Sequence, residues 1–136
     1  MAEETFTPKV VLALIVKDGR FLLIRRKVQL VKALRWAFPG GIVGEAETGE
    51  ESLIRHIKSE VGLDVEIKAR ILERVHPDTF VKIVYFHCES KDSKKPKIGE
   101  PHEIAEVSWI PAKGVLDKFT SDVAPEIQKF IGSYGH

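Results

Sequence analysis

The sequence predicts an α/β fold in which a mixed β-sheet lies between helices. Apolar runs of strand length recur along the chain, and two other segments show the apolar spacing of amphipathic helices. These helical segments alternate with the strand-like runs, which favours a sheet covered by helices on its faces. A chain of 136 residues can bury a sizeable core. We therefore expect residues 1–136 to form a single domain.

The first two strands are expected to form a β-hairpin. A β-branched run at 10–16 is followed by KDGR and then by the apolar run FLLIRR at 21–26. The turn falls at Asp18-Gly19, a dipeptide that tolerates the positive φ angles of tight hairpin turns. Residues 27–35 are ambiguous between helix and loop. The next segment, WAFPGG, predicts a short strand that ends at its proline and the two glycines.

The clearest helix begins at Thr48. Thr48 and Glu51 have the spacing of a capping box, in which each side chain accepts a hydrogen bond from the other residue's backbone N–H. Gly62 is typical of a helix C-terminus. The expected apolar stripe consists of Leu53, Ile54, Ile57 and Val61.

The second half of the chain predicts more strands and a terminal helix. Residues 63–75 and 80–89 are expected to form two long strands around the turn HPDT, and residues 105–110 a further strand. A final amphipathic helix is expected at about 121–131. Its apolar face consists of Val123, Ile127, Phe130 and Ile131.

Composition and charge narrow the class of protein. Lysine and arginine number 21 against 20 acidic residues, which argues against a nucleic-acid polymer as partner. The N-terminus MAEETFTPK is unlike a signal peptide, and the apolar run at 10–16 is too short to span a bilayer. We therefore expect a cytoplasmic protein without membrane contact. The single cysteine, Cys88, is expected to be a buried, inert thiol.

Residues 41–63 carry the most specific pattern in the chain. A glycine is followed after five residues by a glutamate and after seven more by an arginine, ahead of further apolar, acidic and glycine positions. The matching residues are Gly41, Glu47, Arg55, Ile57, Glu60, Gly62 and Leu63. They fill seven of the nine specified positions of the Nudix box, without a gap over 23 residues. The chain thus resembles the Nudix hydrolase family and its small MutT-like members, and the resemblance implies a Nudix-type α/β/α sandwich.

Three positions on one helical face determine how this box can hold a metal. Residues 56, 59 and 60 are spaced i, i+3 and i+4, so they project from the same face. In the family all three are glutamates that hold Mg²⁺ or Mn²⁺, hard cations that prefer oxygen ligands. This chain has His56, Ser59 and Glu60, so two carboxylates are missing. Glu60, on the polar side of the helix, is the expected principal ligand. His56 is expected to be a surface or hydrogen-bonded histidine, with a role as ligand of a softer metal such as Mn²⁺ or Zn²⁺ as the alternative.

The resemblance implies two further ligands for one ion. Gly40 matches the glycine whose carbonyl binds the metal, and Glu103 matches an acidic ligand in the loop before the last strand. The competing residues in this loop are Glu100 and Glu106. The implied metal site is therefore Gly40, Glu60 and Glu103, with Mg²⁺ as the cofactor and Mn²⁺ as the alternative. Both glutamates count as catalytic candidates because the metal they hold would activate water.

Other site residues are also carried over from the family. Arg55 is a catalytic candidate, although an ion pair with Glu47 that braces the loop against the helix is the simpler role. Arg25 and Arg26 end a strand where relatives place an arginine against substrate phosphates, and we expect one of the two to serve. Phe38 is a substrate-binding candidate, with a core position as the alternative.

The resulting interpretation is a metal-dependent hydrolase of a nucleoside diphosphate linked to another moiety, such as a nucleoside triphosphate, that cleaves a pyrophosphate P–O bond. One alternative is nucleotide-sugar hydrolysis by C–O cleavage, as in GDP-mannose mannosyl hydrolase, which lacks the same two glutamates. That enzyme needs a histidine base at the position of Ile104, and here His102 lies on the other side of the ligand. A non-catalytic nucleotide-binding module is the other alternative. The expected partner is a small-molecule nucleotide, and a homodimer is left open.

Overall fold

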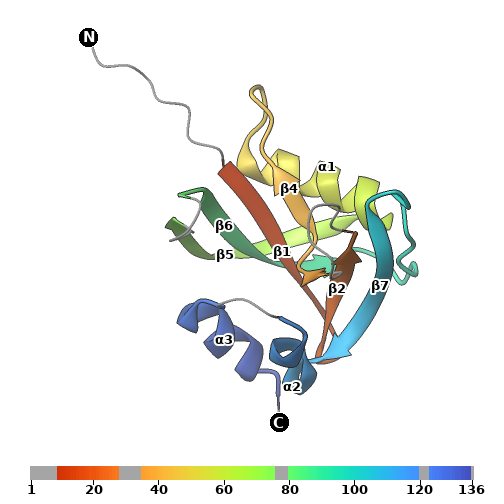
Figure 1. Ribbon diagram of the computed structural model, residues 1–136, viewed down its shortest axis with the longest axis vertical. Coiled ribbons are helices and arrows are strands. Elements are labelled where there is room, and N and C mark those ends of the chain that lie inside the picture. The colour runs from red at the N-terminus through yellow and green to blue at the C-terminus, as the bar shows by residue number, and fades with distance from the viewer. Residues whose placement is uncertain (1–8, 28–34, 76–79, 120–122, 136) are drawn as a thin grey trace.

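The computed structural model describes residues 9–27, 35–75, 80–119 and 123–135 (Figure 1). Its strands are β1 (Lys9–Lys17), β2 (Arg20–Arg26), β3 (Arg35–Ala37), β4 (Gly40–Ile42), β5 (Val65–Val75), β6 (Lys82–Ser90) and β7 (Ile104–Pro111). Its helices are α1 (Gly49–Val61), α2 (Ala112–Val115), the 3-10 helix η1 (Leu116–Lys118) and α3 (Pro125–Gly132). Residues 28–34 and 76–79, where the sequence left an ambiguous segment and a turn, lie outside the described residues.

The sheet is mixed and is organised around β1. This strand runs parallel to β6 and antiparallel to β4, and β6 pairs antiparallel with β5. β1 pairs with β2 only next to the hairpin turn, and β2 continues with β3 and β7. The turn residues Asp18 and Gly19 have φ angles of 52° and 72°, as a tight hairpin turn requires. The predicted hairpin and mixed sheet are therefore confirmed.

Helices cover both faces of the sheet. In β2, Leu22 and Ile24 belong to the core under α1, whereas Phe21 and Leu23 belong to a second core under α2 and α3. Figure 1 shows α1 on one side of the strands and α2 and α3 on the other. The α/β fold with a sheet between helices is thus confirmed, and successive residues of β2 face opposite layers.

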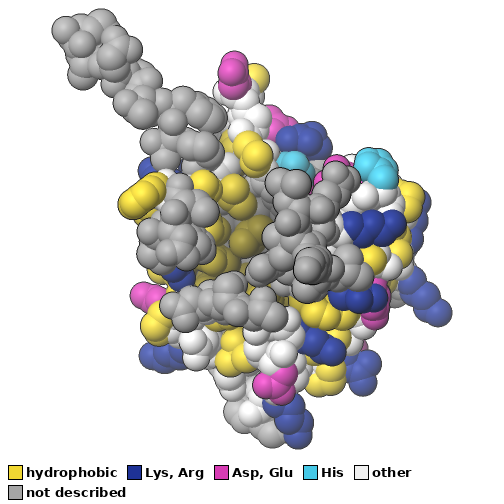
Figure 2. Space-filling model, viewed as in Figure 1, with side chains coloured by type: hydrophobic (Ala, Val, Ile, Leu, Met, Phe, Trp, Pro, Cys, Tyr) yellow, Lys and Arg dark blue, Asp and Glu magenta, His cyan; other side chains and the backbone are white. Residues whose placement is uncertain are grey.

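The surface carries both signs of charge. Figure 2 shows basic and acidic side chains interspersed over the visible face, in keeping with the net charge of +1. In the part of the chain that the structure describes, no helix is long and apolar enough to cross a membrane. Cys88 is buried, as predicted, and burial raises the pKa of its thiol to about 12.

One strand was not predicted from the sequence. The strand expected in WAFPGG ends at Ala37 as β3, and the glycines after Pro39 begin a separate strand, Gly40–Ile42, which forms β4 against β1. Gly40 has a φ of 148°, and a Cβ there would lie 2.0 Å from the carbonyl oxygen of Val11. Glycine is therefore what allows this segment to approach β1 closely.

Two details of the helices also differ from the predictions. Ile54 is 42% exposed and does not belong to the buried stripe of α1. The buried apolar positions Leu53, Ile57 and Val61 are each four residues apart, and Ile54 is rotated away from them. The terminal helix begins at Pro125, because proline is favoured in the first turn and cannot extend a helix backwards. Residues 121 and 122 of the expected helix lie outside the described part.

Candidate functional site

The box helix α1 is fixed at both ends by the residues that the sequence singled out. Thr48 Oγ1 accepts from the backbone N–H of Glu51 at 3.1 Å, and Glu51 Oε1 accepts from that of Thr48 at 3.0 Å. Gly62 ends the helix with a left-handed φ of 74°. The predicted capping box and glycine stop are confirmed, so the side chains of α1 have a defined direction.

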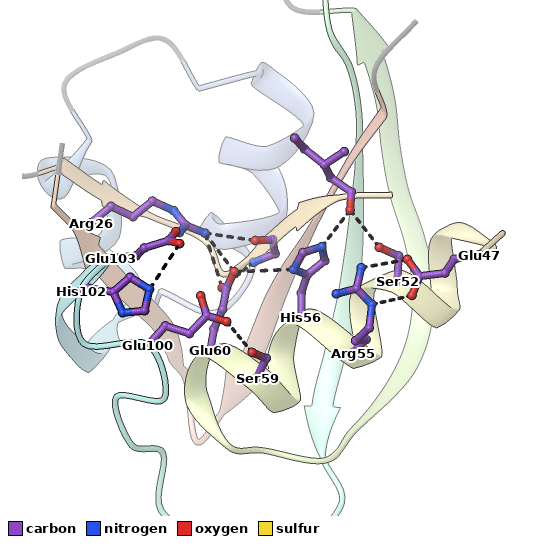
Figure 3. A network of polar contacts seen from close by, with 12 residues as sticks. Arg26, Glu47, Ser52, Arg55, His56, Ser59, Glu60, Glu100, His102 and Glu103 are labelled. Atoms are coloured by element: carbon purple, nitrogen blue, oxygen red, sulfur yellow. Dashed lines mark hydrogen bonds and ion pairs between the residues drawn. The ribbon is translucent and has the colours of Figure 1, made fainter. Parts of the chain in front are cut away.

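Glu60 points from α1 into the interior and not into solvent. It is 4% exposed, so the expectation that it lies on the polar side of the helix is wrong. The backbone N–H of Gly40, on β4, donates to Glu60 Oε1 at 3.2 Å (Figure 3). Burial raises the pKa of the Glu60 carboxyl, and the charge of Arg26 and the Gly40 N–H oppose this shift. A carboxylate in this setting is held in one place and is poorly solvated.

Arg26 reaches the same point from β2. Its Nη2 atom donates to the carbonyl oxygen of Gly40 at 3.1 Å and lies 3.4 Å from each carboxylate oxygen of Glu60. Arg25 points to the opposite face of the sheet, where its Nη2 atom lies 3.0 Å from Glu106 Oε1 and its guanidinium lies over the Trp36 ring. Of the two candidate arginines, the structure brings Arg26 to the box helix.

His56 lies beside Glu60 on the next turn of α1. Its Nε2 atom is 2.8 Å from the carbonyl oxygen of Ile42, which can only accept a hydrogen bond. We therefore assign the proton to Nε2, so that in the neutral ring the lone pair of Nδ1 faces Glu60 Oε2 at 3.8 Å. A side chain at Gly41 would collide with this ring, because a Cβ there would lie 2.5 Å from His56 Cε1.

The loop before β7 packs on the last turn of α1. The backbone N–H of Gly99 donates to the carbonyl oxygen of Glu60 at 2.8 Å, and the Ser59 hydroxyl donates to Glu100 Oε2. A Cβ at Gly99 would lie 2.0 Å from the Ser59 carbonyl oxygen, so this approach depends on glycine. The carboxylate that the loop brings to α1 is therefore that of Glu100.

Glu103, which the sequence assigned as the loop ligand, lies at the surface of the same loop. Its side chain is 59% exposed, and its carboxylate lies 3.9 Å from His102 Nε2. Its carbonyl oxygen accepts from the backbone N–H of Lys27 at 2.8 Å, which ties the loop to the end of β2. The position of Glu103 in the sequence favoured it over Glu100 as the loop ligand. In the structure, Glu100 is the one of the two that contacts Ser59 on α1.

Arg55 and Glu47 form the expected brace. Arg55 Nε lies 2.5 Å from Glu47 Oε2, and Glu47 Oε1 also accepts from the backbone N–H of Gly44 at 3.0 Å. The hydrogen bond from Arg55 lowers the pKa of Glu47 to about 2. Two further box residues, Ile57 and Leu63, are fully buried in the core.

Phe38 belongs to the core and not to an open surface. It is 3% exposed, and its ring centroid lies 5.0 Å from that of Phe119. In this arrangement the ring has no free face for a nucleobase.

The oxygen donors at the centre of the site are of the type that Mg²⁺ prefers. They are the Gly40 carbonyl and the two oxygens of Glu60, and hard cations take such ligands. Among the described residues, no group of three His, Cys, Asp or Glu side chains is arranged to hold a metal ion. One buried carboxylate and one carbonyl thus fit part of a divalent-cation site, which a loop carboxylate and water would have to complete.

Comparisons with known proteins find relatives of this chain. A family model described as "NUDIX domain" matches residues 5–130. An ADP-ribose pyrophosphatase from Methanocaldococcus jannaschii is 42% identical over 65 residues, 48% of this chain and 38% of that protein. A CTP pyrophosphohydrolase from Escherichia coli is 36% identical over 59 residues, 43% of this chain and 44% of that protein. The chain therefore spans less than half the length of these two relatives.

Solved structures show the same fold at low sequence identity. A NUDIX hydrolase from Nitrosomonas europaea aligns with a TM-score of 0.82 and 16% identity, covering 96% of this chain and 73% of that one. A MutT structure from a study of Aliivibrio salmonicida and Vibrio cholerae aligns with a TM-score of 0.72 and 15% identity, covering 94% and 98%. At these identities the likeness concerns the fold alone.

Proposed function

The chain belongs to the NUDIX domain family, and from this premise we propose that it hydrolyses a nucleoside diphosphate linked to another moiety by cleaving a pyrophosphate P–O bond. The observation that carries the proposal is that the Gly40 carbonyl and the buried Glu60 carboxylate meet at one point beside the box helix, where both contact the same nitrogen of Arg26. The names of the relatives, an ADP-ribose pyrophosphatase and a CTP pyrophosphohydrolase, support a nucleotide with a pyrophosphate bond as the substrate class.

The same atoms support a divalent cation as cofactor. Gly40 and Glu60 would hold Mg²⁺, or Mn²⁺, together with a carboxylate from the loop before β7. The sequence assigned that place to Glu103, and the contact with Ser59 supports Glu100 as the better-placed group. When bound, such an ion neutralises phosphate charge and lowers the pKa of a water molecule.

The chain's own residues prepare this reaction. Glu60 is fixed by the Gly40 N–H in a buried environment, where its negative charge acts more strongly on a nearby cation than it would in water. Arg26 brings a guanidinium that can bind a phosphate through two parallel hydrogen bonds. Arg55 acts as a positioning residue through Glu47, because its guanidinium is engaged in the brace.

P–O cleavage is favoured over the C–O route. The position that would carry a histidine base is Ile104, which is 1% exposed in the core. His102 has a side chain that is 81% exposed, and its Nε2 atom lies 3.9 Å from the carboxylate of Glu103. The homodimer and the cytoplasmic location stay predictions.

A panel of substrates tests the proposal. Nucleoside triphosphates, ADP-ribose and GDP-mannose would be incubated with Mg²⁺ or Mn²⁺ and the products separated by chromatography. We expect a nucleoside monophosphate together with pyrophosphate or a sugar phosphate. Free sugar with nucleoside diphosphate would replace the proposal by the C–O route. Binding without turnover of any substrate would replace it by a nucleotide-binding module.

A further inference from the structure

The cation position beside Glu60 already holds a positive group of the protein itself. Arg26 Nη2 contacts three oxygens, the Gly40 carbonyl at 3.1 Å and both Glu60 oxygens at 3.4 Å (Figure 3). These are the same oxygens that the proposed function gives to the metal. One guanidinium and one carboxylate leave the pair without net charge.

Two further groups lie at the carboxylate oxygens of Glu60. Glu60 Oε1 accepts from the backbone N–H of Gly40 at 3.2 Å, and Glu60 Oε2 faces the His56 ring at 3.8 Å. The Arg26 guanidinium occupies the position from which one group contacts both the Glu60 carboxylate and the Gly40 carbonyl. A Mg²⁺ ion binds oxygen at about 2.1 Å, so an ion that joined the carbonyl to the carboxylate would have to enter the space of the guanidinium.

We propose that Arg26 and a divalent cation exclude each other from the site formed by the Gly40 carbonyl and the Glu60 carboxylate. Arg26 holds the site while it contains no metal, and it leaves when the ion binds. The inference rests on the proposed function, because it assumes that these oxygens are metal ligands. It adds that Arg26 weakens metal binding in the absence of substrate.

Electrostatics and the position of Arg26 both support an exchange of this kind. A divalent cation and a guanidinium a few ångströms apart in a partly buried site repel each other strongly, and the carboxylates of Glu60 and one loop glutamate do not compensate their three positive charges. Arg26 is the last residue of β2, follows an irregularity in the pairing with β7, and has a side chain that is 29% exposed. Its guanidinium can therefore turn toward solvent without breaking the strand. A released guanidinium would be free to bind a substrate phosphate.

Metal titration without substrate provides the test. Mn²⁺ would be titrated calorimetrically into metal-free wild type, Arg26→Leu and Arg25→Leu. The Arg25 variant is a matched control, because it removes the neighbouring arginine on the opposite face of the sheet. We expect Arg26→Leu to bind Mn²⁺ at least about tenfold more tightly than wild type, a step of about 1.4 kcal/mol. Arg25→Leu should bind it as wild type does.

The outcomes separate this inference from the proposed function. Equal or weaker Mn²⁺ binding by Arg26→Leu, with clear binding by wild type, overturns the exclusion and leaves the proposed function standing. Absence of binding in both wild type and Arg26→Leu overturns the exclusion and also the proposed metal site.

A measurement on the wild-type protein covers the case in which Arg26→Leu does not fold. NMR of the arginine guanidinium groups would follow Mg²⁺ addition in the absence of substrate. We expect the Arg26 resonances to shift and lose their hydrogen-bonded character, while those of Arg25 stay in place. Unchanged Arg26 resonances at a Mg²⁺ concentration that saturates the protein would overturn the exclusion.

Discussion

Arg26 donates from one nitrogen to both carboxylate oxygens of Glu60, at 3.4 Å each, and so joins the end of β2 to the box helix. The two residues are 34 positions apart in sequence. Their contact places a positive group and a buried carboxylate next to the Gly40 carbonyl. The fold therefore concentrates the chemistry of the site at the meeting point of β2, β4 and α1.

Gly40 is expected to be indispensable for this meeting point. Gly40→Ala would place a Cβ 2.0 Å from the Val11 carbonyl oxygen at a φ of 148°. We expect it to lower the free energy of unfolding by more than about 3 kcal/mol, because neither backbone segment can move away easily. The matched control is Gly132→Ala, where a Cβ meets nothing within 4 Å. Urea denaturation followed by circular dichroism would show whether the two variants differ.

The loop carboxylates should differ in their effect on metal dependence. We expect Glu100→Gln to raise the Mg²⁺ concentration required for half-maximal turnover more than Glu103→Gln does, because Ser59 holds Glu100 against α1. Glu106→Gln serves as the control, since that carboxylate pairs with Arg25 on the other face. A larger effect of Glu103→Gln would restore the assignment made from the sequence.

Ser59 should not accept the family's glutamate without cost. In Ser59→Glu the new carboxylate would face Glu100, whereas Ser59→Ala loses only the hydroxyl hydrogen bond. We expect Ser59→Glu to be less stable than Ser59→Ala by about 1 kcal/mol without metal, through repulsion at an exposed position. Saturating Mg²⁺ should reduce this difference in thermal melts. A difference that is independent of Mg²⁺ would show that residue 59 does not face the metal site.

The Glu47–Arg55 brace should give stability that depends on pH. Its hydrogen bond lowers the pKa of Glu47 from 4.5 to about 2, so the folded state binds this proton less readily than the unfolded state. The stabilisation is therefore present above about pH 4.5 and is lost as the pH falls toward 2. We expect the Tm difference between wild type and Glu47→Gln to shrink across that range. The exposed Glu50 allows a control variant, Glu50→Gln, which should show a smaller change.

Local features of the fold could be predicted from the sequence. The capping box at Thr48 and the turn at Asp18-Gly19 depend on neighbouring residues, and both are confirmed. The pairing of β4 with β1 could not be read in this way, because it brings Gly40 against a strand nearly thirty residues earlier. Strand pairing of this kind is set by tertiary contacts.

The site was predictable in composition but not in arrangement. The spacing of the box singled out Glu60 and the resemblance offered two arginines, but neither indicated which arginine reaches α1 or how deeply the Glu60 carboxylate is buried. The residues of β2 between Arg20 and Arg25 are all apolar and buried, so both faces of the strand look alike in the sequence. The alternation along the strand therefore does not show whether Arg25 or Arg26 faces the box helix. Which glutamate of the loop before β7 reaches α1 depends on where Gly99 packs against the helix, and no local sequence pattern specifies that contact.

Hydrolysis by wild type and Glu60→Gln tests the central claim most directly. A pyrophosphate-linked nucleotide that wild type cleaves would be supplied with saturating Mg²⁺, and ³¹P NMR would follow its products, with circular dichroism as the check on folding. We expect metal-dependent P–O cleavage by wild type and a loss of at least about 100-fold in Glu60→Gln, or about 2.7 kcal/mol of transition-state stabilisation. Retention of more than about a tenth of the wild-type rate by the folded variant, within about 1.4 kcal/mol, would contradict a principal role of Glu60 in the reaction.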